Sequence, residues 1–508
     1  LSKTPRNILN QAIVRAIISE NNGAWFDPED MSTMFQDAAG TTPVTALEQP
    51  VGLWLDKSQG LELGLERVVN GDNEAGISAP PLNTLINFTS KVQSSERAQS
   101  GNYSVKLTSN STSAAHYWNL VSVSAGVSLK ISGWVYIPAG TTANQPIKLV
   151  DIFDGSYTPV IASSFDQWVY FSAIRPAKAT AWALAIGNND AANWNGGSIY
   201  IDNLSVREIK GNHATQPITA SRPTLSARYN LLLNSATLST QSVTTVAAQY
   251  TLSFTGTGSV SLSGTATGTL AGTGANNRVS LSFTPTAGTL TLTVTGPVTL
   301  AMLAFGTLTT YQAITTATSY DGVGWQRYLR GDGVDDFYNL PFMNLYGNGA
   351  CSIVAARDAV SQATDTYIIS ERSTTDADPK YFPSRQLASG GNMDSYIVSD
   401  EGTVRLDTTG SAFSGAKLAA IRSVVDSGNN IKLFKDGAVV ADDDYTRAGT
   451  LTLNNTTIGA SVSTTTSNYA NMRLYGLIIT KSALSDTDRR RCEQFLASRL
   501  STLGVTLS

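Results

Sequence analysis

The sequence predicts an all-β protein made of several β-sandwich domains, with one short helix near each end of the chain. Three observations lead to this fold class. Only 15% of the 508 residues are charged, and glycine, serine and threonine are frequent, as expected of short strands joined by many turns. Apolar and polar residues alternate in short runs between residues 226 and 308. Finally, Asp436-Gly437 lies between two apolar runs, which is a strong β-hairpin signal.

Residues 5–20 predict the N-terminal helix. Pro5 suits the first helical turn, and an apolar stripe follows at helical spacing. The stripe comprises Ile8, Ala12, Ile13, Ala16 and Ile17. A helix of this length is marginal alone, so it should pack against something. In one interpretation, residues 1–23 attach the chain to another protein or hold an oligomer together. In the other, the helix docks on its own domain.

Residues 24–60 read AWFDPEDMSTMFQDAAGTTPVTALEQPVGLWLDKSQG. This segment resembles one that is common in virion proteins of tailed bacteriophages. In those proteins the Asp-Lys-Ser turn runs directly into GNHATQ and SRPTL, which here begin only at Gly211 and Ser221. The resemblance therefore implies that residues 61–210 are an inserted domain. It also implies that 24–60 and 211–225 form one connecting segment, with Trp25–Ser58 close to Asn212–Leu225 in space.

The inserted residues 61–210 resemble a jelly-roll carbohydrate-binding module. The match begins at Val69-Asn-Gly-Asp72 and ends at Ile199-Tyr-Ile-Asp-Asn-Leu-Ser-Val206. Three further matches lie between them in the same order as in that family, at residues 99–107, 132–136 and 167–171. The resemblance implies a β-sandwich that binds carbohydrate.

Strand alternation in this module predicts one aliphatic and one aromatic sheet face. Trp134 and Tyr136 point away from the aliphatic residues around them, and Trp168 and Tyr170 oppose Val169 and Phe171. Aromatic rings cover the C–H faces of sugars, so such a face suits glycan binding. The alternative is that Trp134 and Trp168 form the core between two sheets. The candidate carbohydrate-binding residues are Trp134, Tyr136 and Trp168, together with Tyr117, Trp118, Tyr157 and Trp194, which are expected on exposed loops.

Residues 226–321 predict a small antiparallel β-sandwich with almost no charge. Its alternating pairs and triplets are Leu252/Phe254, Val260/Leu262, Val279/Leu281/Phe283 and Leu290/Leu292/Val294. This part lacks the residue types that catalysis needs, so we expect a spacer or binding role.

Residues 322–508 predict a sandwich that ends in a helix. A hairpin around Asp436-Gly437 precedes the buried strand NMRLYGLIIT and a helix from about Ser485, whose spacing to Asp488 is that of a capping box. The helix carries the apolar stripe Cys492, Phe495, Leu496 and Leu500. This order, with the opening YLRGDGVDDF, resembles the concanavalin A-like (laminin-G-like) fold. That fold serves lectins, adhesion modules and glycanases, so it does not fix a function.

Metal and thiol chemistry has few candidates. Cys351 and Cys492 are the two cysteines; they are expected in the core, and a disulfide between them is the alternative. With two cysteines and two histidines, a Cys/His metal site is excluded. No other cofactor is expected, but Asp332, Asp335 and Asp336 form the best candidate for Ca²⁺, which takes several oxygen ligands. The alternative is that these aspartates only shape a turn.

Catalytic signatures are also absent from the sequence. A glycanase needs two carboxylates flanking the bond, and Glu371, Glu401 and Glu493 stand singly in the C-terminal domain. Asp442–Asp444 is expected to be a solvated turn and Arg489–Arg491 a solvated helix face. The net charge of −4 argues against a nucleic-acid partner, and no apolar run is long enough for membrane insertion.

The sequence therefore favours a non-enzymatic structural protein of a bacteriophage virion, located on the surface of the particle. A receptor-binding tail fibre or other tail protein, acting in host adsorption, is the first interpretation. A capsid-attached head fibre or decoration protein is the second, and a polysaccharide depolymerase the third. The expected partners are host cell-surface polysaccharide or lipopolysaccharide and, through the N-terminus, other virion proteins. Phage fibres suggest a homo-trimer.

Overall fold

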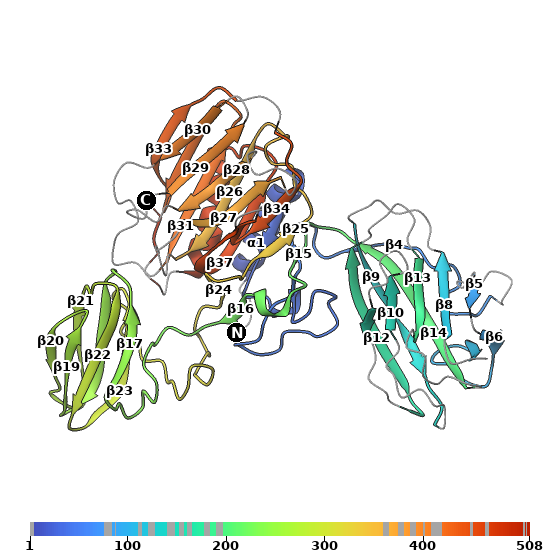
Figure 1. Cartoon of the computed structure of the whole chain (residues 1–508), viewed down its shortest axis with the longest axis horizontal. Coiled ribbons are helices and arrows are strands. Elements are labelled where there is room, and N and C mark those ends of the chain that lie inside the picture. The colour runs from blue at the N-terminus through green and yellow to red at the C-terminus, as the bar shows by residue number, and fades with distance from the viewer. Residues whose placement is uncertain are drawn as a thin grey trace. The chain divides into compact units, whose positions relative to one another are not determined.

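The computed structural model confirms the all-β class, with one helix near each end of the chain (Figure 1). It describes residues 5–507 except 76–83, 87, 110–113, 120–126, 140–147, 152–156, 160–164, 177–182, 189–196, 359–364, 374–379, 387–392, 400–401, 408–418, 448–450, 463–466, 501–502 and 504. No helix within these described residues is both long and apolar enough to span a membrane.

The chain divides into two compact units. Unit 1 comprises residues 1–33, 44–58 and 214–508, and unit 2 comprises residues 34–43 and 59–213. Unit 2 thus interrupts unit 1 in the sequence. The finer division into five parts that the sequence suggests stays a prediction.

Unit 1 contains a two-sheet sandwich whose strands come from both ends of the chain. The order in one sheet is β16 (Thr224–Ser226), β24 (Tyr328–Asp332), β37 (Asn471–Thr480), β26 (Cys351–Arg357), β31 (Ala420–Asp426), β32 (Asn430–Lys435) and β33 (Ala438–Asp444), and β1 (Ala24–Phe26) also pairs with β37. The order in the other is β3 (Leu53–Trp54), β15 (Ala214–Thr215), β25 (Tyr338–Leu340), β34 (Asn455–Ile458), β27 (Thr366–Arg372), β28 (Lys380–Gln386), β29 (Met393–Ser399) and β30 (Gly402–Asp407). A short pair, β35 (Ala460–Val462) and β36 (Ser467–Tyr469), follows β34.

Strand β37 is the buried strand that the sequence predicts. All its residues except Asn471 are buried, because it is flanked by strands on both sides and covered on both faces. The predicted hairpin is also confirmed, since Asp436 and Gly437 join β32 to β33 with φ of 47° and 89°. Positive φ at both central positions is what a type I′ turn requires. The aspartates 442–444 belong to β33 rather than to a turn, and their exposed charges lie on the edge strand of the sheet.

The C-terminal helix α2 (Asp486–Arg499) begins where the capping box predicts. Ser485 Oγ accepts a hydrogen bond from the Asp488 backbone N–H at 3.1 Å. The predicted stripe Cys492, Phe495, Leu496 and Leu500 is buried. The prediction that Arg489–Arg491 forms a solvated helix face is wrong for Arg489. This residue is buried and makes an ion pair of 2.6 Å with buried Glu493. Its neighbours Arg490 and Arg491 are exposed.

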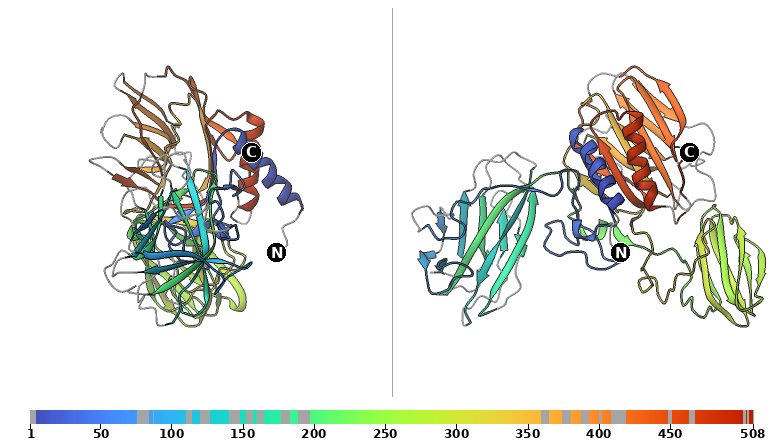
Figure 2. Two further views of the ribbon diagram at one scale, coloured as in Figure 1. Left: turned by 90° about the vertical axis from the view of Figure 1, so that its right-hand side faces the viewer. Right: turned by 180° about the vertical axis from the view of Figure 1, so that it is seen from behind.

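The N-terminal helix α1 (Pro5–Glu20) packs on its own unit, against α2 and β37, and Figure 2 shows the two helices side by side. The predicted stripe is wrong in part. Ala12, Ile13 and Ala16 are exposed, and Ile17 is buried together with Val14 and Ile18. The side chain of Ile8 lies outside the described residues. The buried residues belong to the hydrophobic core that also contains the apolar stripe of α2.

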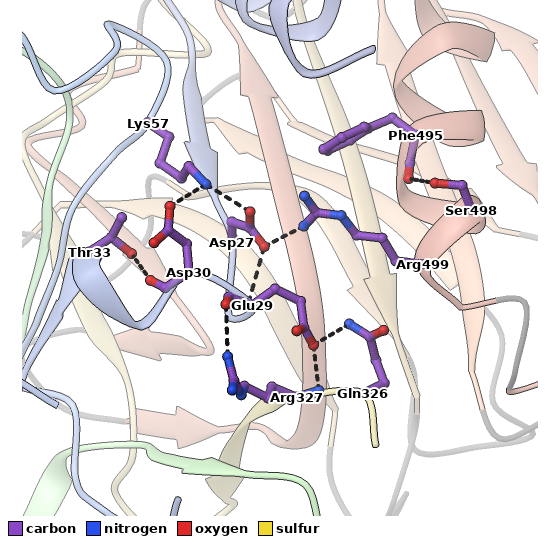
Figure 3. A network of polar contacts seen from close by, with 10 residues as sticks. All are labelled: Asp27, Glu29, Asp30, Thr33, Lys57, Gln326, Arg327, Phe495, Ser498 and Arg499. Carbon is purple, nitrogen blue, oxygen red and sulfur yellow. Dashed lines mark hydrogen bonds and ion pairs between the residues drawn. The ribbon is translucent and has the colours of Figure 1, made fainter. Parts of the chain in front are cut away.

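The segment after α1 is held by buried polar contacts (Figure 3). Asp27 accepts hydrogen bonds from Lys57, at 2.9 Å, and from Arg499 of α2, and Lys57 also makes an ion pair with Asp30 at 2.7 Å. Asp56 accepts the Trp25 and Ser58 backbone N–H groups, each at 2.8 Å. These contacts give the Asp-Pro and Asp-Lys-Ser motifs a structural role in unit 1.

The two halves of the phage-like segment meet in unit 1. Strand β3 pairs with β15 through Trp54↔Ala214 and Leu53↔Thr215. The Val51 N–H donates to the Pro223 carbonyl at 2.8 Å. Trp25–Ser58 and Asn212–Leu225 were expected to lie close together, and these backbone contacts join them.

The small sandwich within unit 1 has the strands that the alternation predicts. Its sheets have the orders β17 (Gln241–Thr245), β22 (Gly288–Thr295), β19 (Ser259–Gly264), β20 (Gly268–Ala271), and β21 (Gly274–Phe283), β18 (Tyr250–Gly256), β23 (Val298–Phe305). The core of this sandwich contains the first residue of three of the predicted alternating runs. These residues, which are fully buried, are Leu252 in β18, Val260 in β19 and Leu290 in β22.

Unit 2 is a sandwich of two antiparallel sheets. One has the order β12 (Trp168–Pro176), β9 (Ser128–Tyr136), β14 (Ser198–Ile209), β7 (Ser104–Ser109), β6 (Phe88–Ser94), with β4 (Leu63–Glu66) also pairing with β14. The other has the order β11 (Tyr157–Pro159), β10 (Lys148–Asp151), β13 (Ala183–Asn188), β8 (Ala114–Asn119), β5 (Thr84–Ile86). The short strand β2 (Met34–Phe35) also belongs to unit 2.

Both cysteines are buried and free, so the core interpretation holds and the alternative disulfide is not formed. Burial raises the pKa of the Cys492 thiol to about 12, which keeps it protonated and unreactive at neutral pH.

Candidate functional site

A row of side chains crosses one face of the unit 2 sheet that contains β12, β9, β14 and β7. The register pairs Trp168 of β12 with Tyr136 of β9, Tyr136 with Tyr200 of β14, and Tyr200 with Lys106 of β7. Residues directly opposite each other on adjacent strands point to the same face. A second row lies two residues further along each strand and pairs Tyr170 of β12 with Trp134 of β9. We call Trp134, Tyr136, Trp168, Tyr170 and Tyr200 the aromatic face.

The aromatic rings contact one another across the strands. The ring centroids are 5.2 Å apart for Trp134 and Tyr170, 5.7 Å for Tyr136 and Trp168, and 6.1 Å for Tyr136 and Tyr200. The rings are tilted or edge-to-face, which is the favoured geometry for aromatic pairs. The aromatic face therefore holds two groups of contacting rings, Trp134 with Tyr170 and Tyr136 with Trp168 and Tyr200.

The aromatic face lies on the outer side of the sheet. Tyr170 is 49% exposed, Trp134 and Trp168 are half-buried, and Tyr136 and Tyr200 are buried at the centre of the row. The residues that alternate with them form the core between the sheets, namely Leu129, Ile131, Val135, Phe171, Ile199 and Ile201. The alternative that Trp134 and Trp168 form this core is therefore wrong.

Polar contacts fix the two buried rings. The Tyr200 hydroxyl donates to Glu96 at 2.6 Å, and Lys106 Nζ donates to the same carboxylate at 2.8 Å. Burial and the hydrogen bond to Glu96 raise the pKa of Tyr200. The Tyr136 hydroxyl donates to Asp166 at 3.2 Å. The rings are thus held in position by the sheet and by the loops that contain Glu96 and Asp166.

Arg97 brings a positive charge to the aromatic face. Its guanidinium lies 4.2 Å from the centroid of the Tyr136 ring and 5.9 Å from that of Tyr200. Arg97 is exposed, and its side chain makes no ion pair within the part of unit 2 that the structure describes. Its backbone carbonyl accepts from Ser104 Oγ at 2.5 Å, and the Gln99 N–H donates to Asp202 at 2.8 Å, so the loop is anchored on either side.

The predicted sugar-binding residues fall into two groups. Trp134, Tyr136 and Trp168 come together on the aromatic face. Tyr117 and Trp118 lie in β8 and Tyr157 in β11, so their expected place on loops is wrong: the runs AAHYWN and YTP pair as strands with their neighbours in the other sheet. The side chains of these three residues, and all of Trp194, lie outside the described residues.

Several residues of this face were not among the predicted site residues. Tyr170 and Tyr200 alternate with aliphatic residues in the same way as Trp168, so the alternation of their strands is a signal that could have included them. Glu96 and Arg97 come from the loop between β6 and β7. No periodicity predicts where a loop side chain points.

The three aspartates of the predicted calcium site also come together, at the end of β24, the YLRGD strand. Their carboxylate oxygens lie within 4.8 Å of one another. The Asp332 carboxylate accepts the Val334 N–H at 2.7 Å, Asp336 accepts the Asp332 N–H at 3.0 Å, and Asp335 accepts Ser221 Oγ at 2.9 Å. These bonds define a turn around Gly333, which has φ of 79°. Three carboxylates would supply only part of the six to eight oxygens of Ca²⁺, and calcium binding stays a prediction.

Asp336 makes a pH-dependent contribution to stability that can be measured. Burial, with the charge of Asp332, raises the pKa of Asp336 to about 7. A carboxyl whose pKa is raised in the folded state stabilises it at low pH, and this contribution is lost as the pH rises from about 4 to about 7. We expect Asp336→Asn, which mimics the protonated form, to flatten this decline by up to about 1.4 kcal/mol per pH unit.

Urea denaturation of the wild type and Asp336→Asn between pH 4 and pH 8 checks this expectation. The exposed Asp443→Asn substitution in β33 controls for the removal of one carboxylate. Parallel curves for the wild type and Asp336→Asn would show that Asp336 does not hold its proton in the folded protein.

The single glutamates of the C-terminal sandwich have structural partners. Buried Glu371 accepts the Leu345 and Tyr346 N–H groups at 2.9 and 3.1 Å, and Glu493 makes the ion pair with Arg489. Glu401 lies outside the described residues. Among the described glutamates of this domain, these contacts assign no catalytic pair.

No protein-family model and no curated protein matches the sequence. Solved structures match parts of it. The CBM40 module of the Ruminococcus gnavus IT-sialidase, bound to α2,3-sialyllactose, is 18% identical over 32% of this chain and 93% of that chain, with a TM-score of 0.28. The CBM22-1 xylan-binding domain of Paenibacillus barcinonensis Xyn10C is 17% identical over 30% of this chain and 96% of that chain, with a TM-score of 0.22.

A leech intramolecular trans-sialidase, complexed with 2,7-anhydro-Neu5Ac, is 15% identical over 36% of this chain and 27% of that chain, with a TM-score of 0.29. Carbohydrate-binding modules are thus among the structures that this chain resembles. At these identities and TM-scores, the resemblance does not assign a ligand to it.

Proposed function

We propose that this chain is a non-enzymatic glycan-binding protein and that the aromatic face of unit 2 is its binding surface. The observation that carries the proposal is a set of five aromatic rings, in two contacting groups, on the outer face of a sheet whose inner face already supplies the core. Cross-strand contacts between Trp134, Trp168, Tyr170 and their neighbours stabilise the sheet by only about 0.2–1 kcal/mol per pair, and a ligand with apolar C–H faces can stack on the exposed surfaces of these rings.

The chemistry of the face suits a sugar better than a purely apolar ligand. Glu96, Lys106 and Asp166 surround the rings with charged and hydrogen-bonding groups, and sugars present hydroxyl groups around their apolar faces. The fixed rings lose little conformational freedom on binding, which favours affinity. An apolar platform with polar groups at its margin is the usual form of a specific binding site.

The proposed setting is the surface of a tailed-phage virion, where the protein would recognise host surface polysaccharide or lipopolysaccharide as a tail-associated receptor-binding protein. Its support is the resemblance of residues 24–60 and 211–225 to segments of phage virion proteins. A head fibre or decoration protein is the alternative location. Immunogold labelling of the intact particle tests the location, and gold found on neither tail nor head would contradict it.

Self-association and attachment to other virion proteins form the remaining part of this proposal. A homo-trimer is expected from the resemblance to phage fibres. The buried side of α1 already packs within unit 1, so the exposed residues of that helix would have to make any contact between chains.

Glycan binding is tested by removing exposed rings. Stacking on one ring contributes about 0.5–1.5 kcal/mol in addition to the burial of apolar surface area. Trp168→Ala and Tyr170→Ala should therefore each lower the affinity for the glycan by up to roughly tenfold. Several sites in an oligomer would enlarge the effect through avidity. Binding to an array of bacterial surface polysaccharides, with purified protein, measures the change.

The matched control is Tyr103→Ala. Tyr103 is 36% exposed in the same unit but lies outside the aromatic face. We expect this variant to bind like the wild type, and all three variants to remain folded, which the melting temperature of unit 2 checks. Equal binding by Trp168→Ala, Tyr170→Ala and the wild type would contradict the assignment of the aromatic face as the binding surface.

A further inference from the structure

We propose that Arg97 makes the aromatic face selective for glycans that carry a carboxylate. This inference rests on the proposed function, since it concerns the ligand of the same face. The ligand class is an acidic polysaccharide, in which a carboxylated sugar stacks on the rings and its carboxylate pairs with the guanidinium.

The two cations beside the row differ in their partners. Lys106 Nζ is 2.8 Å from Glu96, so its charge is already paired. Arg97 lies above the Tyr136 ring and has no ion-pair partner in the described part of unit 2, although Glu96 precedes it in the chain. Two further carboxylates lie near the row: Asp166 accepts the Tyr136 hydroxyl and the Ala139 N–H, and Asp202 accepts the Gln99 and Ser100 N–H groups. Arg97 is therefore the positive group at this face that remains available to a ligand.

The position of Arg97 suits the binding of a carboxylate. A guanidinium that lies over an aromatic ring uses its charge in that contact and keeps its N–H donors for other groups. Its planar fork matches the two oxygens of a carboxylate. Because the loop is anchored through the Arg97 carbonyl and through Gln99, the side chain starts from a fixed backbone. Little conformational freedom is then lost when the ligand binds.

The carboxylate could belong to either of two kinds of sugar. In a uronic acid it replaces the terminal CH₂OH group, and in a nonulosonic acid it is attached to the anomeric carbon. Both place a carboxylate beside a ring whose C–H groups can stack. The structure points to their shared chemistry, and the probes of the experiment distinguish the two sources.

The experiment measures the affinity of the full chain for polygalacturonate, alginate, hyaluronan and polysialic acid, each beside its carboxyl-reduced form. We expect the wild type to bind at least one acidic polymer and to lose about tenfold or more in affinity for the reduced form. Arg97→Gln should lose the same factor toward the acidic polymer, and its remaining binding should not change on reduction. Arg97→Lys should recover only part of the loss, because lysine lacks the planar fork.

Lys106→Gln is the matched control, since it removes a cation from the same row whose charge Glu96 already pairs. It should change the preference for the acidic form less than Arg97→Gln does. A wild type that binds none of the four acidic polymers, or binds acidic and reduced forms equally, overturns the proposal. So does an Arg97→Gln variant that keeps the preference.

The result also separates this inference from the proposed function. Binding to reduced or neutral polymers that Trp168→Ala weakens, without any preference for carboxylate, would leave the glycan-binding role standing and refute the role of Arg97. If Trp168→Ala binds both acidic and neutral polymers as the wild type does, the aromatic face is not the binding surface.

Discussion

Asp27→Ala is expected to lower the free energy of unfolding of unit 1 by about 3–5 kcal/mol, because Arg499 loses its ion-pair partner and buried Lys57 keeps only the partly exposed Asp30. The Asp27 side chain is 2% exposed and that of Lys57 is 7% exposed, and Arg499 joins them from the terminal helix (Figure 3). Alanine removes the carboxylate that these two cations share. Chemical denaturation followed by tryptophan fluorescence measures the loss, since Trp25 and Trp54 of unit 1 are buried.

The same variant should change the response to acid. Burial would raise the pKa of Asp27, but the charges of Arg499 and Lys57 more than offset burial and lower it. A carboxyl with a lowered pKa stabilises the folded state above its unfolded value of about 3.8, and that contribution disappears as the pH falls through the folded value. The wild type should therefore lose more stability in acid than Asp27→Ala does.

Asp442→Ala is the matched control. Asp442 makes a 3.2 Å ion pair with Lys432 in which both side chains are nearly half exposed. Exposed pairs contribute about 0–1 kcal/mol. If Asp27→Ala costs no more than Asp442→Ala, the Asp27 network does not stabilise the fold, and the Asp-Pro and Asp-Lys-Ser motifs need another explanation.

The Asp27 network includes a contact that the sequence pattern does not predict. The resemblance of these segments to phage virion proteins predicted that Trp25–Ser58 would lie near Asn212–Leu225, because the motifs are continuous in the proteins they resemble. The partner Arg499 could not be predicted, since it is 472 residues away from Asp27 and belongs to the terminal helix. Sequence patterns describe neighbours within an element, whereas a buried ion pair depends on how distant elements pack.

The sequence predicts only part of the aromatic face. Period-2 alternation places Trp134 and Tyr136 on one side of a strand, whatever the rest of the fold. Alternation does not determine which face of the strand a second sheet covers, and in this structure the aliphatic residues are the ones that face the other sheet. Arg97 comes from a loop, where no period applies, and its position above Tyr136 follows from the hydrogen bonds of its backbone.

The N-terminal helix itself was predicted correctly, but its buried stripe was predicted only in part. Residues 5–20 form the expected helix, but the sequence offers more apolar residues than one stripe can hold. With Ile13 and Val14 adjacent, and Ile17 and Ile18 adjacent, two stripes fit a period of 3.6. Packing against α2 and β37 selected the stripe that contains Val14 and Ile18. Similarly, Arg489 is part of a charged run and is nevertheless buried, because Glu493 is one turn away to pair with it.

The two isoleucines of α1 give the second large prediction. Ile18 is fully buried, and Ile13 is 36% exposed on the same helix. Ile18→Ala should lower the free energy of unfolding by about 2–5 kcal/mol through lost burial and the cavity that remains. Ile13→Ala should change it by about 0.5 kcal/mol or less, as is usual for a surface substitution. The midpoint of chemical denaturation of unit 1 measures both.

The comparison also decides what α1 does. If the helix serves only its own unit, Ile18→Ala is destabilising at every protein concentration and Ile13→Ala leaves the molar mass in light scattering unchanged. If the exposed residues Ala12, Ile13 and Ala16 hold chains together, Ile13→Ala lowers the molar mass and the stability depends on protein concentration. A destabilising Ile13→Ala together with a neutral Ile18→Ala would contradict the packing of α1 on α2, because the buried residue must then contribute less than the exposed one.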